Sequence, residues 1–142
     1  MTEKVLTFYL SGSLIGINVT LIKEINRNIE YTPVPDSSAH IIGLFNMRGQ
    51  VVTLFNLARL IGLEEDRKLE RLTCIILKEP HDPDQVGFII DCPGEVIDID
   101  REEYELPPAN VGGVESEFIS SVVKLKEELL IVINPKKVLN AN

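Results

Sequence analysis

The stretch GLFNMRGQVVTLFNLARLI, residues 43–61, decides the fold, because a second stretch of the chain follows the same pattern. Residues 121–139, SVVKLKEELLIVINPKKVL, match it at an offset of 78. Each stretch holds two apolar runs around a basic residue in a tight turn, then an asparagine, then a short helical segment. The match predicts a duplicated unit built from a hairpin and a short helix.

Two further segments repeat in the same order along the chain. Residues 16–25, GINVTLIKEI, match residues 87–96, GFIIDCPGEV, at an offset of 71. Residues 31–35, YTPVP, resemble residues 104–108, YELPP, at an offset of 73. Because the three matches keep their order and their offsets only grow, a duplication explains them better than chance. A period above 70 residues is too long for a solenoid repeat and fits a duplicated lobe.

Short β-branched segments separated by turn residues dominate the chain, and helix is sparse. The expected strands are Lys4–Leu10, Leu14–Val19, Ile42–Met47, Gln50–Phe55, Leu72–Leu77, Val86–Ile90, Val96–Ile99, Ser120–Leu125 and Leu129–Ile133. Short helices are expected at Pro35–His40, at Leu57–Ile61 and from Asn134-Pro135, where Asn can cap and Pro suits the first helical position. The pattern is all-β.

The predicted architecture is a single domain, residues 1–142, made of two SH3-like five-stranded β-barrel lobes packed together. Lobe one covers about residues 12–70. Lobe two covers about residues 71–134 plus the N-terminal strand, and a short helix over residues 135–142 ends the chain. A lobe of this size buries little surface alone, so the two should share a core and bind partners where they meet.

Charge argues against nucleic-acid binding, because the chain carries 14 basic and 22 acidic residues for a net charge of −8. Residues 1–70 hold 7 basic and 8 acidic residues, a net of −1, whereas residues 71–142 hold 7 and 14, a net of −7. The acidic half could attract a basic partner or simply favour solubility.

The chain has no apolar run of the roughly 18–20 residues that span a bilayer, and its N-terminus lacks a signal-peptide pattern. A cytoplasmic protein without membrane insertion is therefore expected. Cys74 and Cys92 sit in or beside apolar runs without CxxC spacing, which favours buried reduced thiols over a disulfide or a ligand pair.

Motifs of catalysis are missing: the chain has no GxxxxGK[ST], GxGxxG, HExxH or GxSxG pattern. His40 and His81 lie in turn-like segments, and the carboxylates of residues 98–105 form one polar stretch typical of a solvated face. The sequence therefore predicts no enzyme, no cofactor and no metal. The alternative from another class is a small-barrel enzyme or ligand-binding domain, with converging carboxylates or a metal near Asp82 and Asp84.

Arg48 and Gly49 form the predicted tip of the hairpin in residues 43–61. Gly49 supplies the positive φ that a tight turn needs, and the arginine is presented for a planar contact with a partner's carboxylate. An exposed arginine without a role is the simpler alternative. Glu24, alone among apolar neighbours in LIKEI, is a candidate intramolecular partner for Arg48.

At this hairpin the chain resembles the CheW family, the coupling proteins of bacterial chemosensory arrays. The family signature, Gly-[Val/Ile]-x-Asn-Leu-Arg-Gly followed by a strand and Asp-Leu, reads Gly43–Gly49 and Asn56-Leu57 here. The resemblance covers nearly the whole chain, in order. Its other matches are Ile22–Ile25 for Val-x-Glu-Ile, Thr32–Pro35 for x-Pro-Val-Pro, Val86–Asp91 and Glu95-Val96 for the second-half elements, and residues 120–140 for the last hairpin and helix.

The resemblance implies a non-enzymatic adaptor that couples chemoreceptors to a CheA-type histidine kinase through the kinase's similar regulatory domain. The cytoplasmic tip of methyl-accepting receptors would dock between the lobes, which recruits the adaptor to membrane-associated arrays. A scaffold of a non-flagellar chemosensory pathway is the alternative within the family. The receptor- or kinase-binding positions implied by motif are Ile22, Glu24, Gly43, Asn46, Arg48 and Gly49.

The chain departs from the family pattern at several positions. Met47 replaces the usual Leu, and Asn56 and Asn134 replace the usual Asp, which keeps helix capping but removes charge. Ser120-Ser121 stands where a glycine is expected before the last hairpin. The segment Cys92-Pro93-Gly94 in the second copy is expected to bend sharply.

Overall fold

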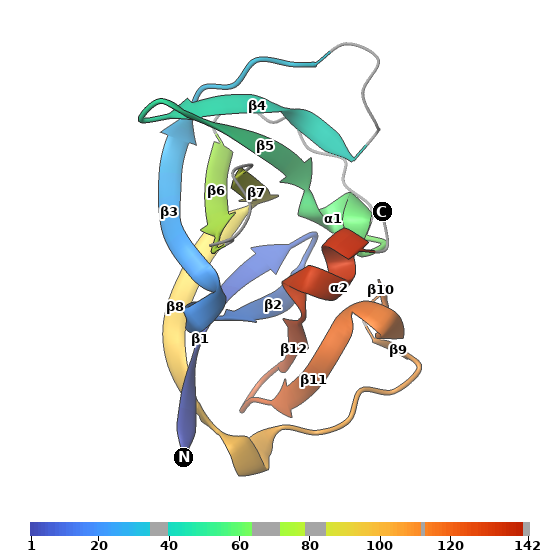
Figure 1. The fold of residues 1–142 in the computed structure, drawn as a ribbon. Helices are drawn as coiled ribbons and strands as arrows, with labels where there is room; N and C mark the ends of the chain where they lie inside the picture. Colours follow the sequence, from blue (N-terminus) through green and yellow to red (C-terminus); the bar gives the residue numbers. More distant parts are fainter. Residues whose placement is uncertain (35–39, 64–71, 79–84, 112, 141–142) are drawn as a thin grey trace.

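The computed structural model describes residues 1–34, 40–63, 72–78, 85–111 and 113–140, and it confirms an all-β fold (Figure 1). Within these residues, no helix is long and apolar enough to cross a membrane. The strands are β1 (Thr2–Leu10), β2 (Ser13–Asn18), β3 (Ile22–Ile29), β4 (Ile41–Met47), β5 (Gln50–Asn56), β6 (Leu72–Leu77), β7 (Gln85–Ile90), β8 (Cys92–Asp100), β9 (Asn110–Val111), β10 (Val114–Glu115), β11 (Ile119–Lys124) and β12 (Leu129–Ile133).

Helical segments are short. They are α1 (Leu57–Leu60), α2 (Pro135–Asn140) and the 3-10 turns η1 (Val19–Leu21), η2 (Arg101–Glu103) and η3 (Ser116–Phe118). Two predicted helices are confirmed, with Asn56 Oδ1 accepting from Arg59 N at 3.3 Å and Asn134 Oδ1 accepting from Lys136 N at 3.1 Å. Both asparagines therefore keep the capping role despite the loss of charge. The third predicted helix, Pro35–His40, lies outside the described residues except for His40.

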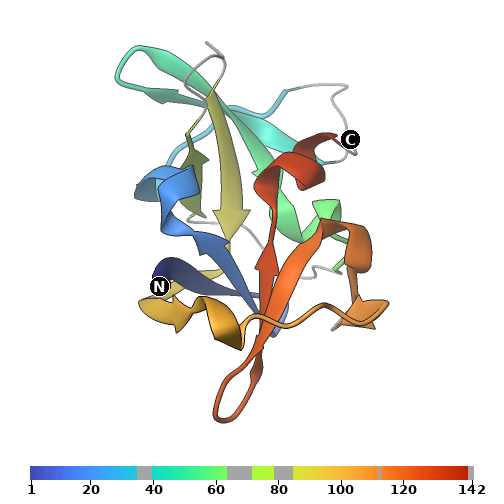
Figure 2. The ribbon, with the colours of Figure 1, turned by 60° about the horizontal axis from the view of Figure 1, so that its bottom comes forward.

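The strands form two five-stranded sheets, as predicted. The first lobe is the sheet with strand order β3-β6-β7-β5-β4, and the second lobe is the sheet with order β11-β12-β2-β1-β8. Figure 1 shows the first lobe above the second, with α1 and α2 side by side where they meet, and Figure 2 agrees. The strands β9 and β10 form a separate hairpin that the sequence analysis did not predict.

The predicted lobe boundaries do not match the sheets. Strand β2 lies in the second lobe, and β6 and β7 lie in the first, although the expected boundary fell between residues 70 and 71. Each lobe takes three strands from its own copy and a hairpin from the other copy, through the parallel pairs β5–β7 and β12–β2. Parallel pairs join strands that are distant in the chain, so local patterns do not reveal them. The N-terminal strand β1 does lie in the second lobe, as expected.

The duplication is visible in single hydrogen bonds. Thr32 and Leu44 form an isolated antiparallel bridge in the first copy, and Glu105 and Val122 form the same bridge in the second. These pairs lie at the predicted offsets of 73 and 78 residues. The asparagines that precede the two helices also match, since Asn56 N donates to His40 O at 2.8 Å and Asn134 N donates to Phe118 O at 3.0 Å.

The two lobes share one large core and each keeps a smaller one. Alternate residues of β6 show this arrangement: Ile75 packs into the core between the sheets, and Ile76 packs into the core inside the first lobe. The helices α1 and α2 also contribute to the shared core, through Leu57 and Val138 among others. The lobes therefore share much of their buried apolar surface, and we expect them to fold as one unit.

The strand β3 was missed. The sequence analysis expected no strand between Val19 and Ile42, but an eight-residue strand begins at Ile22, directly after the 3-10 turn that ends at Leu21. This strand lies at the edge of its sheet and exposes alternate residues, including Lys23 and Arg27. Because one of its faces is largely polar, it lacks the apolar run that identified the other strands.

Strand β8 begins at Cys92, four residues before the predicted start, and the expected sharp bend at Cys92-Pro93-Gly94 is not there. Instead the strand continues past a shift in register opposite Leu6 and Phe8 of β1. The shift is a bulge, which absorbs the glycine and the proline without ending the strand.

The thiol of Cys74 is expected to resist alkylation in the folded chain. Burial, with a smaller contribution from the Glu24 carboxylate, raises the pKa of Cys74 from 9.0 to about 12. Only the thiolate reacts, so iodoacetamide should not modify Cys74 in native buffer at about pH 8 but should do so in denaturant. Mass spectrometry of a Cys92→Ser variant isolates this thiol. Rapid modification of the folded chain would show that Cys74 is not buried as described.

The raised pKa of Cys74 also predicts how the stability of the fold depends on pH. Because the thiol ionises more readily in the unfolded chain, its contribution to stability is complete below pH 9.0 and is lost as the pH rises towards about 12. A Cys74→Ala variant should show a smaller loss of stability over this range in denaturant titrations.

Candidate binding site at the first-lobe hairpin

The hairpin between β4 and β5 turns through two residues in left-handed backbone conformation. Arg48 has φ 50° and Gly49 has φ 84°, the combination of a type I′ turn. Asn46 stabilises this turn, because its Oδ1 accepts a hydrogen bond from Gly49 N at 3.1 Å. The arginine is therefore held in a conformation that non-glycine residues rarely adopt.

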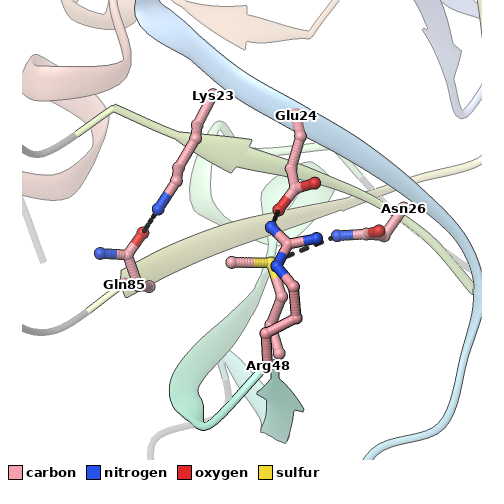
Figure 3. A network of polar contacts seen from close by, with 6 residues as sticks. Lys23, Glu24, Asn26, Arg48 and Gln85 are labelled. Atoms are coloured by element: carbon pink, nitrogen blue, oxygen red, sulfur yellow. Dashed lines mark hydrogen bonds and ion pairs between the residues drawn. The ribbon is translucent and has the colours of Figure 1, made fainter.

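Arg48 forms an ion pair with Glu24, which confirms the predicted intramolecular partner (Figure 3). The Nη2 and Oε1 atoms are 2.6 Å apart. The Arg48 side chain is still 70% exposed, whereas that of Glu24 is 25% exposed. An exposed pair of this kind contributes about 0.2–1 kcal/mol. Its main effect is to orient the guanidinium while leaving most of its donors open to a partner.

Two further contacts tie β3 to the same region, and the sequence analysis missed both. Asn26 Nδ2 donates to Met47 Sδ at 3.5 Å, and Lys23 Nζ donates to Gln85 Oε1 at 3.5 Å (Figure 3). Recognition of β3 as a strand would have placed Asn26 on the same face as Glu24, two residues away. Nothing in the sequence indicates Gln85, because its strand pairs with β5 from the other copy.

These contacts close the first lobe. Strands β3 and β4 are the two edges of its sheet, and the contacts of Glu24 and Asn26 with the β4–β5 hairpin join them at one end. At the other end, the bridge between Thr32 and Leu44 joins the segment that follows β3 to β4. Between the two closures lies an open pocket of about 610 Å³, lined by β3, β4 and the segment that connects them.

Two of the predicted site residues do not lie at the tip. Ile22 pairs with Leu77 of β6 and packs against the shared core. Gly43 is buried where the chain crosses β4, since a Cβ built there would lie 2.5 Å from Thr32 O. The tip therefore contains Glu24, Asn46, Arg48 and Gly49, and Gly43 acts through the packing of the strand.

Apolar side chains lie beside the tip on the outer face of the hairpin. Leu44 and Asn46 alternate onto this face, and Val51 pairs with Asn46 across the strands. Leu44 is 37% exposed and Val51 is 56% exposed, which is unusual for strand residues of this size. Exposed apolar residues next to an oriented arginine are typical of a protein-binding surface.

The acidic residues and histidines of the described part of the chain are not gathered into one site. No group of three His, Cys, Asp or Glu residues there is placed to hold a metal. The carboxylates of β8 and η2 are spread along a surface, where Asp98 pairs with Lys4 and Glu103 caps η2. His81, Asp82 and Asp84 lie outside the described residues.

A pair of five-stranded lobes that share a core and present a charged hairpin defines a small β-barrel binding protein. The CheW-like domain family matches residues 4–142 of the chain. The chemotaxis protein CheW of Bacillus subtilis is 30% identical over 138 residues, which cover 97% of this chain and 87% of that protein. The chemotaxis protein CheW of Treponema pallidum is 29% identical over 141 residues, covering 97% and 82%.

A solved structure agrees with these relatives. The scaffolding protein TtCheW from Thermoanaerobacter tengcongensis has a TM-score of 0.82 and 26% identity, covering 94% of this chain and 90% of that one. The chain belongs to the CheW family. It is a chemotaxis coupling adaptor, a scaffold rather than an enzyme.

The Gly49→Val substitution is expected to lower the free energy of unfolding by about 1–2 kcal/mol, because valine is strained at positive φ. No atom lies within 4 Å of a Cβ built at Gly49, so the cost comes from the backbone conformation alone. Gly49→Asn is the matched control, since asparagine tolerates this region, and it should lose less. Equal losses in denaturant titrations would contradict this account of the turn.

Proposed function

We propose that this adaptor links the cytoplasmic tips of methyl-accepting chemoreceptors to the regulatory domain of a CheA-type histidine kinase. It acts in the cytoplasm and is recruited to membrane-associated receptor arrays, without inserting into the membrane or binding nucleic acid. Family membership supports the coupling role, and the hairpin supports the location of one interface.

The observation that carries the kinase interface is the oriented, exposed arginine of the first lobe. Arg48 is held by Glu24 and still has 70% of its side chain exposed. Leu44 and Val51 lie on the outer face of the same hairpin and would supply apolar burial around it. A charged anchor inside an apolar surround is the arrangement that carries most binding energy in protein interfaces.

The receptor would approach from the side where the lobes meet. Ile22 is only partly buried at the margin of the shared core, close in the chain to Glu24. A receptor tip is a helical hairpin, which buries its apolar face best in an apolar groove. Ile22 is therefore assigned to the receptor side, and Asn46, Arg48 and Gly49 to the kinase side, with Glu24 and Gly43 supporting the hairpin.

A titration with the regulatory domains of the CheA-type kinases of the same organism tests the proposal. The unmodified chain should bind one of them, and Arg48→Glu should bind much more weakly. Lys4→Glu is the matched control, because it reverses a charge and breaks the exposed Lys4–Asp98 pair of the second lobe. Failure of the unmodified chain to bind any of these domains would refute the kinase-adaptor role.

A further inference from the structure

The second lobe contains a counterpart of the hairpin site of the first lobe, but its turn and its side-chain contacts are different. Strand β8 repeats β3 at an offset of 71 residues, so Glu95 corresponds to Glu24. Both strands shift register at this point, between Ile22 and Glu24 in β3 and opposite Leu6 and Phe8 in β8. The two glutamates therefore occupy equivalent positions at the edges of equivalent sheets.

The hairpins that face these glutamates have the same length but different turns. Lys126 corresponds to Arg48 at an offset of 78, and Leu125 N donates to Glu128 O at 2.9 Å to close a two-residue turn. Among the described residues, positive φ occurs at Arg48 and not at Lys126. Within the described part of the chain, Lys126 and Glu95 form no ion pair with each other.

In the second lobe, a pocket of about 250 Å³ lies at the position that corresponds to the polar contacts of the first lobe. Its lining includes Leu14, Gly94, Ile97 and Leu125, the counterparts of Gln85, Lys23, Asn26 and Met47. These four first-lobe residues form the two side-chain hydrogen bonds that lie beside the Arg48–Glu24 pair (Figure 3). In the second lobe a glycine and three apolar side chains replace them, so these two hydrogen bonds cannot form and a pocket lies at this position.

The lining of this pocket suits a guanidinium group. Glu95 and Glu128 supply two carboxylates, and the Tyr9 ring supplies an aromatic wall. Tyr9 OH donates to Glu128 Oε1 at 2.8 Å, which orients that carboxylate. This hydrogen bond is also the largest cause of the raised pKa of Tyr9. Ile97 and Leu125 line the space that an alkyl stem would occupy. The pocket is smaller than the sites that hold drug-sized ligands, about 300–1,000 Å³, and has the scale of one long side chain.

We propose that this pocket of the second lobe binds an arginine side chain of a partner protein, which supplies in trans the group that Arg48 supplies in cis. Arginine is favoured over lysine because its planar fork can contact two carboxylates at once and stack on the tyrosine ring. The inference goes beyond the proposed function, because it rests on the comparison of the two copies and not on the identity of the kinase or receptor.

The probe is the blocked tripeptide acetyl-Gly-Arg-Gly-amide, titrated into the full chain and followed by NMR. We expect shifts concentrated at Tyr9, Gly94 and Glu95, and no such shifts with the uncharged citrulline analogue. Glu95→Gln should weaken binding about tenfold, the effect of losing about 1.4 kcal/mol of charge-assisted hydrogen bonding. The matched control is Glu102→Gln, an exposed glutamate of η2 outside the pocket, which should bind as the unmodified chain does.

A filled variant gives an independent test. Lys126→Arg combined with Glu127→Gly recreates the first-lobe turn, so the new arginine should reach Glu95 and occupy the pocket in cis. This variant should keep the native NMR spectrum elsewhere and lose tripeptide binding. Shifts spread over the acidic surface, equal affinity for the citrulline analogue, or unchanged binding by both the filled and the Glu95→Gln variants would overturn the proposal. No kinase or receptor is used, so the outcome is separate from the test of the adaptor role.

Discussion

Gly43→Ala is expected to lower the free energy of unfolding by about 3 kcal/mol, through overpacking and the loss of backbone hydrogen bonds. The added Cβ would lie 2.5 Å from Thr32 O and 2.7 Å from Tyr31 Cδ2. Thr32 cannot retreat without breaking its two 2.8 Å hydrogen bonds with Leu44, which close the edge of the first lobe. Chemical denaturation of the two proteins measures the difference.

The second copy provides the matched control for this substitution. Ser121 corresponds to Gly43 at an offset of 78, next to the equivalent bridge of Glu105 with Val122, and it accommodates a side chain there. Ser121→Gly should therefore change stability by less than about 1 kcal/mol. A loss below about 0.5 kcal/mol for Gly43→Ala would mean that β4 can move away from the crossing chain, and that the close approach is not required.

Arg48→Glu is expected to weaken kinase binding on the order of 100-fold, the size of effect seen at interface hot spots. It removes the guanidinium from the hairpin tip and places a carboxylate opposite Glu24, which was 2.6 Å from the arginine. The folded state should lose only about 1 kcal/mol, because the arginine is mostly exposed. Isothermal titration with the kinase regulatory domain, together with denaturant unfolding, separates the two quantities.

The double variant Glu24→Arg with Arg48→Glu distinguishes two roles of the arginine. It restores an ion pair between β3 and the hairpin with the charges exchanged, so stability should recover. Binding should stay weak, because the partner would now meet a carboxylate at the tip. Recovery of full binding by the double variant would show that Arg48 acts only by closing the first lobe and does not contact the kinase.

The hairpin tip could be predicted because its causes are local. Gly49 in a two-residue connection between apolar runs indicates a tight turn, and a lone glutamate among apolar neighbours indicates a nearby cation. Both expectations are confirmed, by the positive φ of Gly49 and by the pair of Arg48 with Glu24. The repeat also indicated two equivalent units, each with a hairpin and an asparagine-capped helix, and both caps are present.

The exchange of strands between the copies could not be predicted in the same way. Strand β7 pairs in parallel with β5, and β2 pairs in parallel with β12, each across a long stretch of chain. Periodicity along one strand carries no information about which distant strand lies beside it. The consecutive lobes expected from the repeat are therefore interleaved, with β2 in the second lobe and β6 and β7 in the first.

Four of the predicted site residues, Glu24, Asn46, Arg48 and Gly49, lie together at the hairpin tip, and two neighbouring contacts were not predicted. Gly43 was assigned to binding by motif, and the structure shows a packing role beneath Thr32. Asn26 and Gln85 were missed, since one lies on an unrecognised edge strand and the other comes from the opposite copy. The role of a motif residue depends on which side chains the fold brings to it, and the motif alone does not specify these.

Receptor control of kinase autophosphorylation, measured in membranes that contain a chemoreceptor and the CheA-type kinase of the same organism, tests the coupling role most directly. With the unmodified chain present, receptor ligand should change the autophosphorylation rate. Without the chain, or with Arg48→Glu in its place, the rate should no longer respond. A response of equal size with and without the chain would contradict the account.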